Sequence, residues 1–140
     1  MTVPPLKRIL LLDDDPHILT IAKMALEKVG GFVVQTCSSS QEAVEQAPAF
    51  SPDMILLDVM MPGMDGFETL KALHALPETA NTIVVFLTAL VPPHAQARLK
   101  EMPDVETIAK PFDPMTLSET IVKIWKKKHG EFNQSVTRPN

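Results

Sequence analysis

Five short apolar runs, separated by stretches with helical periodicity, are the feature that most restricts the fold of this 140-residue chain. The runs are four or five residues long and occupy positions 9–12, 32–36, 54–57, 83–87 and 105–109. A short apolar run without alternation is typical of a strand that is buried on both faces of a parallel sheet. The second and fifth runs carry polar residues, which favours places at the sheet edges.

Helix signals follow each of these runs. The start signals are Asp15-Pro16, Ser39 with Glu42, Gly66, Pro92-Pro93 and Asp113-Pro114. In the first helix, the residues expected to face the core are Ile18, Ala22, Ala25 and Val29. Alternating strands and helices predict right-handed βαβ units, in which every strand of the sheet runs parallel to its neighbours.

This alternation predicts a doubly wound α/β fold with a five-stranded parallel sheet in the order 2-1-3-4-5, flanked by five helices. In that order the first and third strands are neighbours, at the point where the strand order reverses. Open parallel sheets bind their ligands beyond the carboxyl ends of the strands at such a point. The fold therefore predicts where a site would lie.

Acidic residues stand at this predicted point. Asp13 and Asp14 directly follow the first apolar run, and Asp58 directly follows the third. Thr88 and Lys110 follow the fourth and fifth runs, which places them on the same edge of the sheet. Three clustered carboxylates repel one another unless a cation joins them, and a hard divalent cation such as Mg²⁺ prefers oxygen ligands. We therefore expect a Mg²⁺ site, with Mn²⁺ as a possible substitute.

Composition excludes several classes of protein. The chain is 45% hydrophobic and 21% charged, with a net charge of −4, which gives no indication of a nucleic-acid or membrane-surface partner. No apolar run approaches the length of a membrane span, and the start lacks the apolar stretch of a signal peptide. Cys37 is the one cysteine, so an intrachain disulfide is impossible; we expect a buried thiol and a cytoplasmic location.

Four motifs together resemble the receiver domain of two-component response regulators. They are Leu12-Asp13-Asp14-Asp15-Pro16, Asp58 with Met61-Pro62-Gly63-Met64-Asp65-Gly66, Thr88-Ala89, and Lys110-Pro111-Phe112. Each motif is weak alone, but their order and their positions at strand ends make the set specific. The resemblance covers roughly residues 6–128. It implies a flavodoxin-like, CheY-like fold and a phosphorylation-dependent signalling switch that is not an enzyme and assists only its own phosphorylation and dephosphorylation.

The resemblance also assigns roles. Asp58 would accept a phosphoryl group from a sensor histidine kinase or a histidine phosphotransfer protein, by attack of its carboxylate on phosphorus. The metal would be held by the side chains of Asp13, Asp14 and Asp58 and by the backbone carbonyl of Met60. Thr88 and Lys110 would contact phosphoryl oxygens. The Lys110–Pro111 peptide bond is predicted to be cis. Asp15 and Asp65 are interpreted as helix-start residues, without a chemical role.

Phosphorylation of such a domain alters the face formed by the fourth helix, fifth strand and fifth helix, where an unknown downstream protein would bind. The family often has an aromatic residue three positions before the lysine, but this chain has Thr107 there. Two positions that control water near the phosphoryl group hold Met60 and Leu90, which are apolar. We therefore expect slow self-dephosphorylation, whereas the output mechanism is left open.

The expected domain spans residues 6–128, followed by a flexible polar tail over 129–140. We expect a stand-alone receiver that does not bind nucleic acid directly or enter a membrane, although a fragment of a larger regulator or hybrid kinase would have the same sequence.

An enzyme is the main alternative. A haloacid-dehalogenase-type phosphatase would use Asp13 as its nucleophile, but its Asp-x-Asp-x-Thr/Val motif fails here at His17. A nucleotide- or flavin-binding module would need a Gly-rich loop where the acids stand. A structural pseudo-receiver would lack acidic or lysine residues that this chain has.

Overall fold

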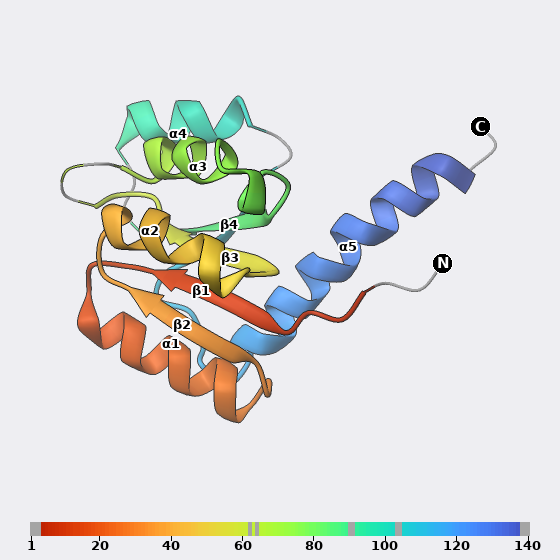
Figure 1. Cartoon of the computed structure of the whole chain (residues 1–140), viewed down its shortest axis with the longest axis horizontal. Helices are drawn as coiled ribbons and strands as arrows, with labels where there is room; N and C mark the ends of the chain where they lie inside the picture. The colour runs from red at the N-terminus through yellow and green to blue at the C-terminus, as the bar shows by residue number, and fades with distance from the viewer. Residues whose placement is uncertain (1–3, 62, 64, 90–91, 103–104, 138–140) are drawn as a thin grey trace.

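Helices cover both faces of one parallel sheet, which gives the molecule three layers (Figure 1). The computed structural model describes residues 4–61, 63, 65–89, 92–102 and 105–137, with side chains described as far as residue 130. The strands are β1 (Arg8–Leu12), β2 (Val33–Cys37), β3 (Met54–Asp58), β4 (Ile83–Thr88) and β5 (Glu106–Ala109). The helices are α1 (Pro16–Lys28), α2 (Ser40–Phe50), α3 (Gly66–His74), η1 (Pro77–Thr79, a 3₁₀ turn), α4 (Pro93–Lys100) and α5 (Leu117–Thr137).

The strand order is β2-β1-β3-β4-β5, and every pairing is parallel, which confirms the predicted topology. The register aligns the carboxyl ends of the central strands. Leu12 of β1 pairs with Leu57 of β3, and Asp58 pairs with Leu87 of β4. Because Asp13 and Asp58 each follow one member of the Leu12–Leu57 pair, both acids leave the sheet at the same level.

The core lies in two layers, one on each face of the sheet. Alternation along β1 sends Leu10 and Leu12 toward the layer beneath α2 and α3, and Ile9 and Leu11 toward the layer beneath α1 and α5. All four side chains are fully buried. Burial of each contributes roughly 1.5–3 kcal/mol, so the central strands form a rigid base for the loops that follow them.

The start of α1 agrees with the sequence, but the end of its predicted core face does not. The Asp15 side chain caps the helix by accepting a hydrogen bond from the His17 backbone N–H, and Pro16 occupies the first turn, as predicted. Val29 was expected in the core, yet its side chain is 51% exposed. Val29 lies just past the last helical residue, and periodicity cannot indicate how far the core extends beneath a helix.

The last helix differs from its predicted length. The sequence predicts a domain that ends at residue 128 and a flexible polar tail after it, and α5 continues past that point to Thr137. Once a helix is formed, each added residue gains one hydrogen bond, and a polar sequence does not by itself end it. Figure 1 shows this end of α5 projecting away from the sheet. No helix in the described ranges, α5 included, is long and apolar enough to cross a membrane.

Candidate functional site

Three carboxylates meet at the carboxyl edge of the sheet, as the sequence predicted. Asp13, Asp14 and Asp58 each place an oxygen atom within 4.8 Å of the others. Asp13 and Asp58 are buried, because they leave adjacent central strands, whereas Asp14 is exposed. The cluster therefore has two acids in its floor and one at its mouth.

Both carboxylate oxygens of Asp13 have donors. The backbone N–H of Asp15 donates to Oδ1 at 2.9 Å, and the ammonium group of Lys110 donates to Oδ2 at 2.9 Å. The Asp13 backbone N–H donates to the carbonyl of Cys37 in the neighbouring strand at 3.2 Å. The carboxylate of Asp13 is thus fixed from both sides. The contact with the Asp15 backbone is one that sequence reasoning missed.

Asp58 lies in a less favourable electrostatic environment. Its Oδ1 accepts a hydrogen bond from the backbone N–H of Met60 at 3.3 Å and lies 3.3 Å from Nζ of Lys110. Burial, followed by the negative charge of Asp13, raises the pKa of the Asp58 carboxyl to about 6, although Lys110 and the Met60 N–H act in the opposite direction. The carboxylate is therefore ionised at neutral pH at a cost in free energy.

Lys110 joins the two buried acids. Its ammonium group lies 2.9 Å from Asp13 and 3.3 Å from Asp58, and its side chain is only 13% exposed. Burial alone would lower its pKa, but the hydrogen bond to Asp13 and the attraction of both carboxylates outweigh burial and raise it above the ordinary value. Lys110 therefore stays charged. The Lys110–Pro111 peptide bond is cis, which confirms that prediction.

Thr88 lies at the same edge, one strand away from Asp58. Leu87 is the register partner of Asp58, so Thr88 is one residue beyond the acid on β4. The backbone N–H of Lys110 donates to the Thr88 carbonyl, which ties the two residues together at the strand ends. Thr88 itself is half-buried at this edge.

The loop between β3 and α3 passes close to the end of β3, where Asp58 lies. The Gly66 backbone N–H donates to the carbonyl of Val59 at 2.7 Å, and a Cβ atom at Gly66 would lie 2.7 Å from the carbonyl oxygen of Asp58. Asp65 caps α3 through a reciprocal capping box with Glu68, which agrees with its interpretation as a helix-start residue. Gly66 therefore permits α3 to begin directly against the site, a contact that the sequence alone did not reveal.

The donor set suits a hard divalent cation. Three carboxylates face one ammonium group, and within the described ranges no other side-chain cation is recorded in an ion pair with these acids. Next to burial, the negative charge of Asp13 is what raises the pKa of Asp58. Oxygen ligands at this spacing match the coordination that Mg²⁺ and Mn²⁺ prefer. Leu90, Pro62 and Met64, which sequence analysis included near the site, lie outside the described residues.

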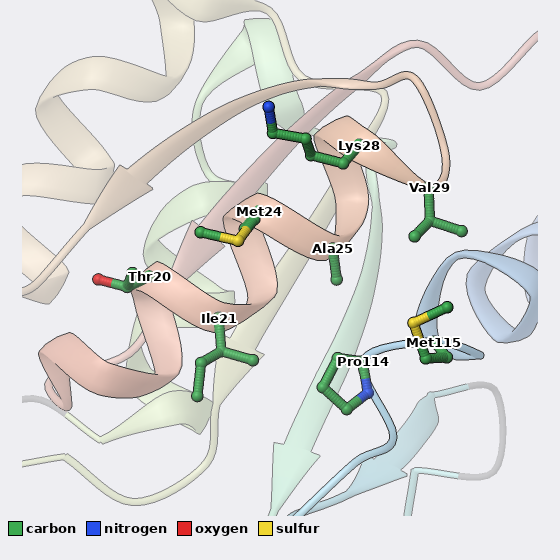
Figure 2. A pocket seen from close by; sticks show the side chains of 8 residues that line it. All are labelled: Thr20, Ile21, Met24, Ala25, Lys28, Val29, Pro114 and Met115. Carbon is green, nitrogen blue, oxygen red and sulfur yellow. The ribbon is translucent and has the colours of Figure 1, made fainter.

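A second surface feature lies along α1, the helix that follows the Asp13–Asp14 loop. A hollow of about 320 Å³ separates α1 from Pro114 and Met115, which follow β5 (Figure 2). The apolar side chains around it are well exposed, at 45% for Ile21, 55% for Met24 and 71% for Met115. Val29, the residue misplaced in the predicted core, also lines this hollow. Contiguous exposed apolar side chains of this kind typically mark an interaction surface.

Comparison with known proteins gives one consistent result. The family model described as "Response regulator receiver domain" matches residues 9–122. The alkaline phosphatase synthesis transcriptional regulatory protein PhoP of Bacillus subtilis is 31% identical over 121 residues, which cover 86% of this chain and 49% of PhoP. The signal transduction histidine-protein kinase BarA of Escherichia coli is 32% identical over 146 residues, which cover 94% of this chain and 15% of BarA.

Solved structures agree with the sequence relatives. The chemotaxis protein CheY4 of Vibrio cholerae has a TM-score of 0.76 and 29% identity, over 86% of this chain and 99% of that chain. A CheY-like receiver protein from Methanospirillum hungatei also has a TM-score of 0.76, with 28% identity over 91% of this chain and 99% of that chain. The chain thus spans about half of PhoP, a small part of BarA, and nearly the whole of these structures. The phosphatase alternative, with Asp13 as nucleophile, finds no support among them.

Proposed function

The chain belongs to the response regulator receiver domain family, a phosphoryl-transfer switch of two-component signalling, and on this premise we propose that Asp58 is its phosphoacceptor. One observation carries the assignment. Asp58 is a buried, ionised carboxylate at a strand end, and Lys110 bridges it to Asp13 at 3.3 and 2.9 Å. Phosphoryl transfer depends mainly on positioning and charge neutralisation, and these residues can supply both.

In the proposed reaction, a carboxylate oxygen of Asp58 attacks the phosphorus of a phosphohistidine. The new oxygen–phosphorus bond forms as the phosphorus–nitrogen bond breaks, and the electron pair returns to the imidazole of the donor. Lys110, already within 3.3 Å of Asp58, neutralises one phosphoryl oxygen. Thr88 donates a hydrogen bond to another from the end of β4. The donor protein is a sensor histidine kinase or a histidine phosphotransfer protein.

The metal site is assigned to the same residues. The side chains of Asp13, Asp14 and Asp58 and the backbone carbonyl of Met60 would hold Mg²⁺, or Mn²⁺ in its place. When bound, the cation neutralises charge that accumulates on the phosphoryl oxygens. Each Asp13 oxygen accepts one hydrogen bond and keeps a second lone pair, so Asp13 would be able to hold the cation while Lys110 stays in place.

A small acyl phosphate tests the assignment directly. The full chain is incubated with acetyl phosphate and Mg²⁺, and the modified residue is located by mass spectrometry of its peptides. We expect one phosphoryl group on Asp58, none in Asp58→Asn, and none after chelation of the metal. Phosphate on Asp13 would refute the assignment and favour the phosphatase chemistry.

The apolar hollow beside α1 supports a place for the donor protein. Ile21 and Met24 lie on α1, which begins directly after Asp13–Asp15. Met115 lies in the loop between β5 and α5, the loop that also holds Lys110. A donor whose histidine reaches Asp58 must lie over this edge of the molecule. Exposed methionines adapt their shape to a partner, which suits an apolar face of a donor helix.

Comparison of a phosphorylated donor protein with acetyl phosphate distinguishes docking of the donor from the phosphoryl-transfer step itself. The double variant Ile21→Ala with Met24→Ala is expected to slow transfer from a phosphorylated donor protein about tenfold or more, and to leave phosphorylation by acetyl phosphate unchanged. Val33→Ala is the matched control, since Val33 is 52% exposed on β2, outside the hollow. Equal slowing of both reactions would contradict this docking surface.

The remaining assignments concern the output. We infer that phosphorylation alters the face of α4, β5 and α5, where Thr107 is exposed on β5. The partner there is a protein, with no direct contact to nucleic acid, and the domain occupies residues 6–128 in the cytoplasm.

Met60 is apolar and 39% exposed near Asp58, which supports a slow loss of the phosphoryl group because it cannot orient water by hydrogen bonding.

A further inference from the structure

A groove between α3 and α4 lies on the opposite layer of the molecule from α1 and α5. A hollow of about 460 Å³ is lined by residues of both helices and by Met102. A second hollow of about 310 Å³ adjoins it toward the beginning of β4 and shares Leu70 and His74 with it. The two hollows together form an elongated depression, which is here called the α3–α4 groove.

The floor of the α3–α4 groove is apolar and rigid. Phe67, Leu70 and Met102 line it, and the first two are 4% and 7% exposed. The ring of Phe67 packs on Phe86 of β4 with 5.4 Å between ring centroids. The floor is therefore anchored to the central sheet, and only small parts of Phe67 and Leu70 are exposed in the groove, beside the half-buried Met102.

The rim carries positive charge. Lys71 and Arg98 line the larger hollow beside His74, and Lys128, which pairs with Glu106 at 3.9 Å, lines the smaller one. No carboxylate of the described residues lines either hollow.

Two of these cations are available to a partner. Arg98 lies over the Phe67 ring at 4.2 Å, and neither Arg98 nor Lys71 is recorded in an ion pair within the described ranges. By contrast, Lys23 on α1 pairs with Glu27, and Lys127 pairs with Glu106. Of the acids three residues away in the chain, Glu68 near Lys71 is engaged in the capping box of α3, whereas Glu101 near Arg98 is exposed at the end of α4.

We propose that the α3–α4 groove is a docking site for an acidic amphipathic segment of a partner protein. Apolar side chains of the segment pack on Phe67, Leu70 and Met102, and its carboxylates face Lys71 and Arg98. Charge complementarity selects this occupant over an apolar one, because burying unpaired cations against an uncharged segment is unfavourable. The groove lies apart from the acidic site, so the proposal does not depend on the role of Asp58.

A pair of designed peptides tests the proposal on the full chain. The first is a helical peptide with a leucine stripe flanked by glutamates, and the second has glutamine at each glutamate position. Binding is measured by fluorescence anisotropy and mapped by amide chemical shifts. We expect the glutamate peptide to bind about tenfold or more tightly than its counterpart, with shifts centred on Phe67, Leu70 and Met102.

Charge variants of equal net charge provide the matched comparison. Lys71→Gln with Arg98→Gln is expected to weaken the glutamate peptide about tenfold, whereas Lys23→Gln with Lys28→Gln on α1 changes its affinity less than about twofold. Arg98→Lys, which keeps the charge, should retain most of the binding and so separates charge from packing.

Three results would overturn the proposal. The first is equal binding of the two peptides, and the second is shifts centred on the α1 hollow around Met24 and Met115. The third is preferential capture of a single-stranded oligonucleotide by the same cations, which would identify an anion surface of a different kind.

Discussion

Replacing Asp58 with asparagine is expected to stabilise the metal-free protein at neutral pH, although the substitution alters a buried polar site. Burial and the charge of Asp13 raise the pKa of the Asp58 carboxyl from 3.8 to about 6. The ionised form is therefore less favourable in the folded protein than in the unfolded chain. Asparagine has nearly the same shape and carries no charge.

The size of the effect follows from the shift. A shift of about two pH units corresponds to roughly 3 kcal/mol for the ionised group. The gain in stability is smaller than this, because Asp58→Asn also removes the contact between Lys110 and the Asp58 carboxylate. Lys110 keeps its hydrogen bond of 2.9 Å to Asp13. We expect a net gain of about 1–2 kcal/mol, which raises the melting temperature by roughly 3–8 °C.

The sign of the pH dependence follows as well. A carboxyl whose pKa is raised by folding binds a proton more tightly in the folded state, so it favours unfolding fully above pH 6 and not at all below pH 3.8. The advantage of Asp58→Asn over the unmodified protein is therefore largest at pH 7–8. It shrinks as the pH falls through about 6.

Urea denaturation in the presence of a chelator measures this difference. Trp125 is the one tryptophan, and its indole N–H donates to the carbonyl of Pro4 at 2.7 Å, so its fluorescence reports loss of tertiary structure. Asp14→Asn is the control, since Asp14 is exposed and its charge is solvated. If Asp58→Asn gains no stability at pH 7.5, or gains the same amount at pH 5, the electrostatic reasoning is wrong.

Three further substitutions test the geometry of the site. Gly66→Ala is expected to lower Mg²⁺ affinity and to destabilise the protein by about 1–3 kcal/mol, because a Cβ atom would lie 2.7 Å from the Asp58 carbonyl oxygen. Calorimetric titration measures the Mg²⁺ affinity, and urea denaturation measures the stability. Lys110→Ala leaves the buried Asp13 and Asp58 without their cation, so stability at pH 7.5 should fall by about 3 kcal/mol; a fall below 1 kcal/mol would contradict the bridging role. Met60→Asn is expected to shorten the lifetime of phosphorylated Asp58 about tenfold, as followed by loss of the phosphoryl mass, and an unchanged lifetime would exclude a role for this position in placing water.

The sequence predicted the strands because their signal is local. Each central strand is an apolar run that must be buried, and β3 is buried along its whole length. The order 2-1-3-4-5 and the meeting of Asp13, Asp14 and Asp58 then followed from the rules of parallel sheets. The cap at Asp15 likewise depends on neighbouring residues only.

The exposure of Val29 and the length of α5 depend instead on how far each helix extends over the sheet. Val29 has the spacing of a core residue and is exposed, since the end of a helix need not overlie the sheet. The length of α5 has a related cause, because polar composition does not determine where a helix stops. Neither outcome is encoded in a short window of sequence.

The sequence by itself determined which acids and which lysine would share one edge of the sheet, because register and topology depend on apolar patterning. Only the tertiary structure decided how they divide their contacts. Lys110 lies closer to Asp13 than to Asp58, and Gly66 lets α3 begin against the end of β3. The α3–α4 groove was also invisible in the sequence, since Lys71 and Arg98 line one hollow only after two helices pack on the same layer. Side-chain partners of this kind depend on distances of a few ångströms between segments that are remote in the chain, which local patterns do not contain.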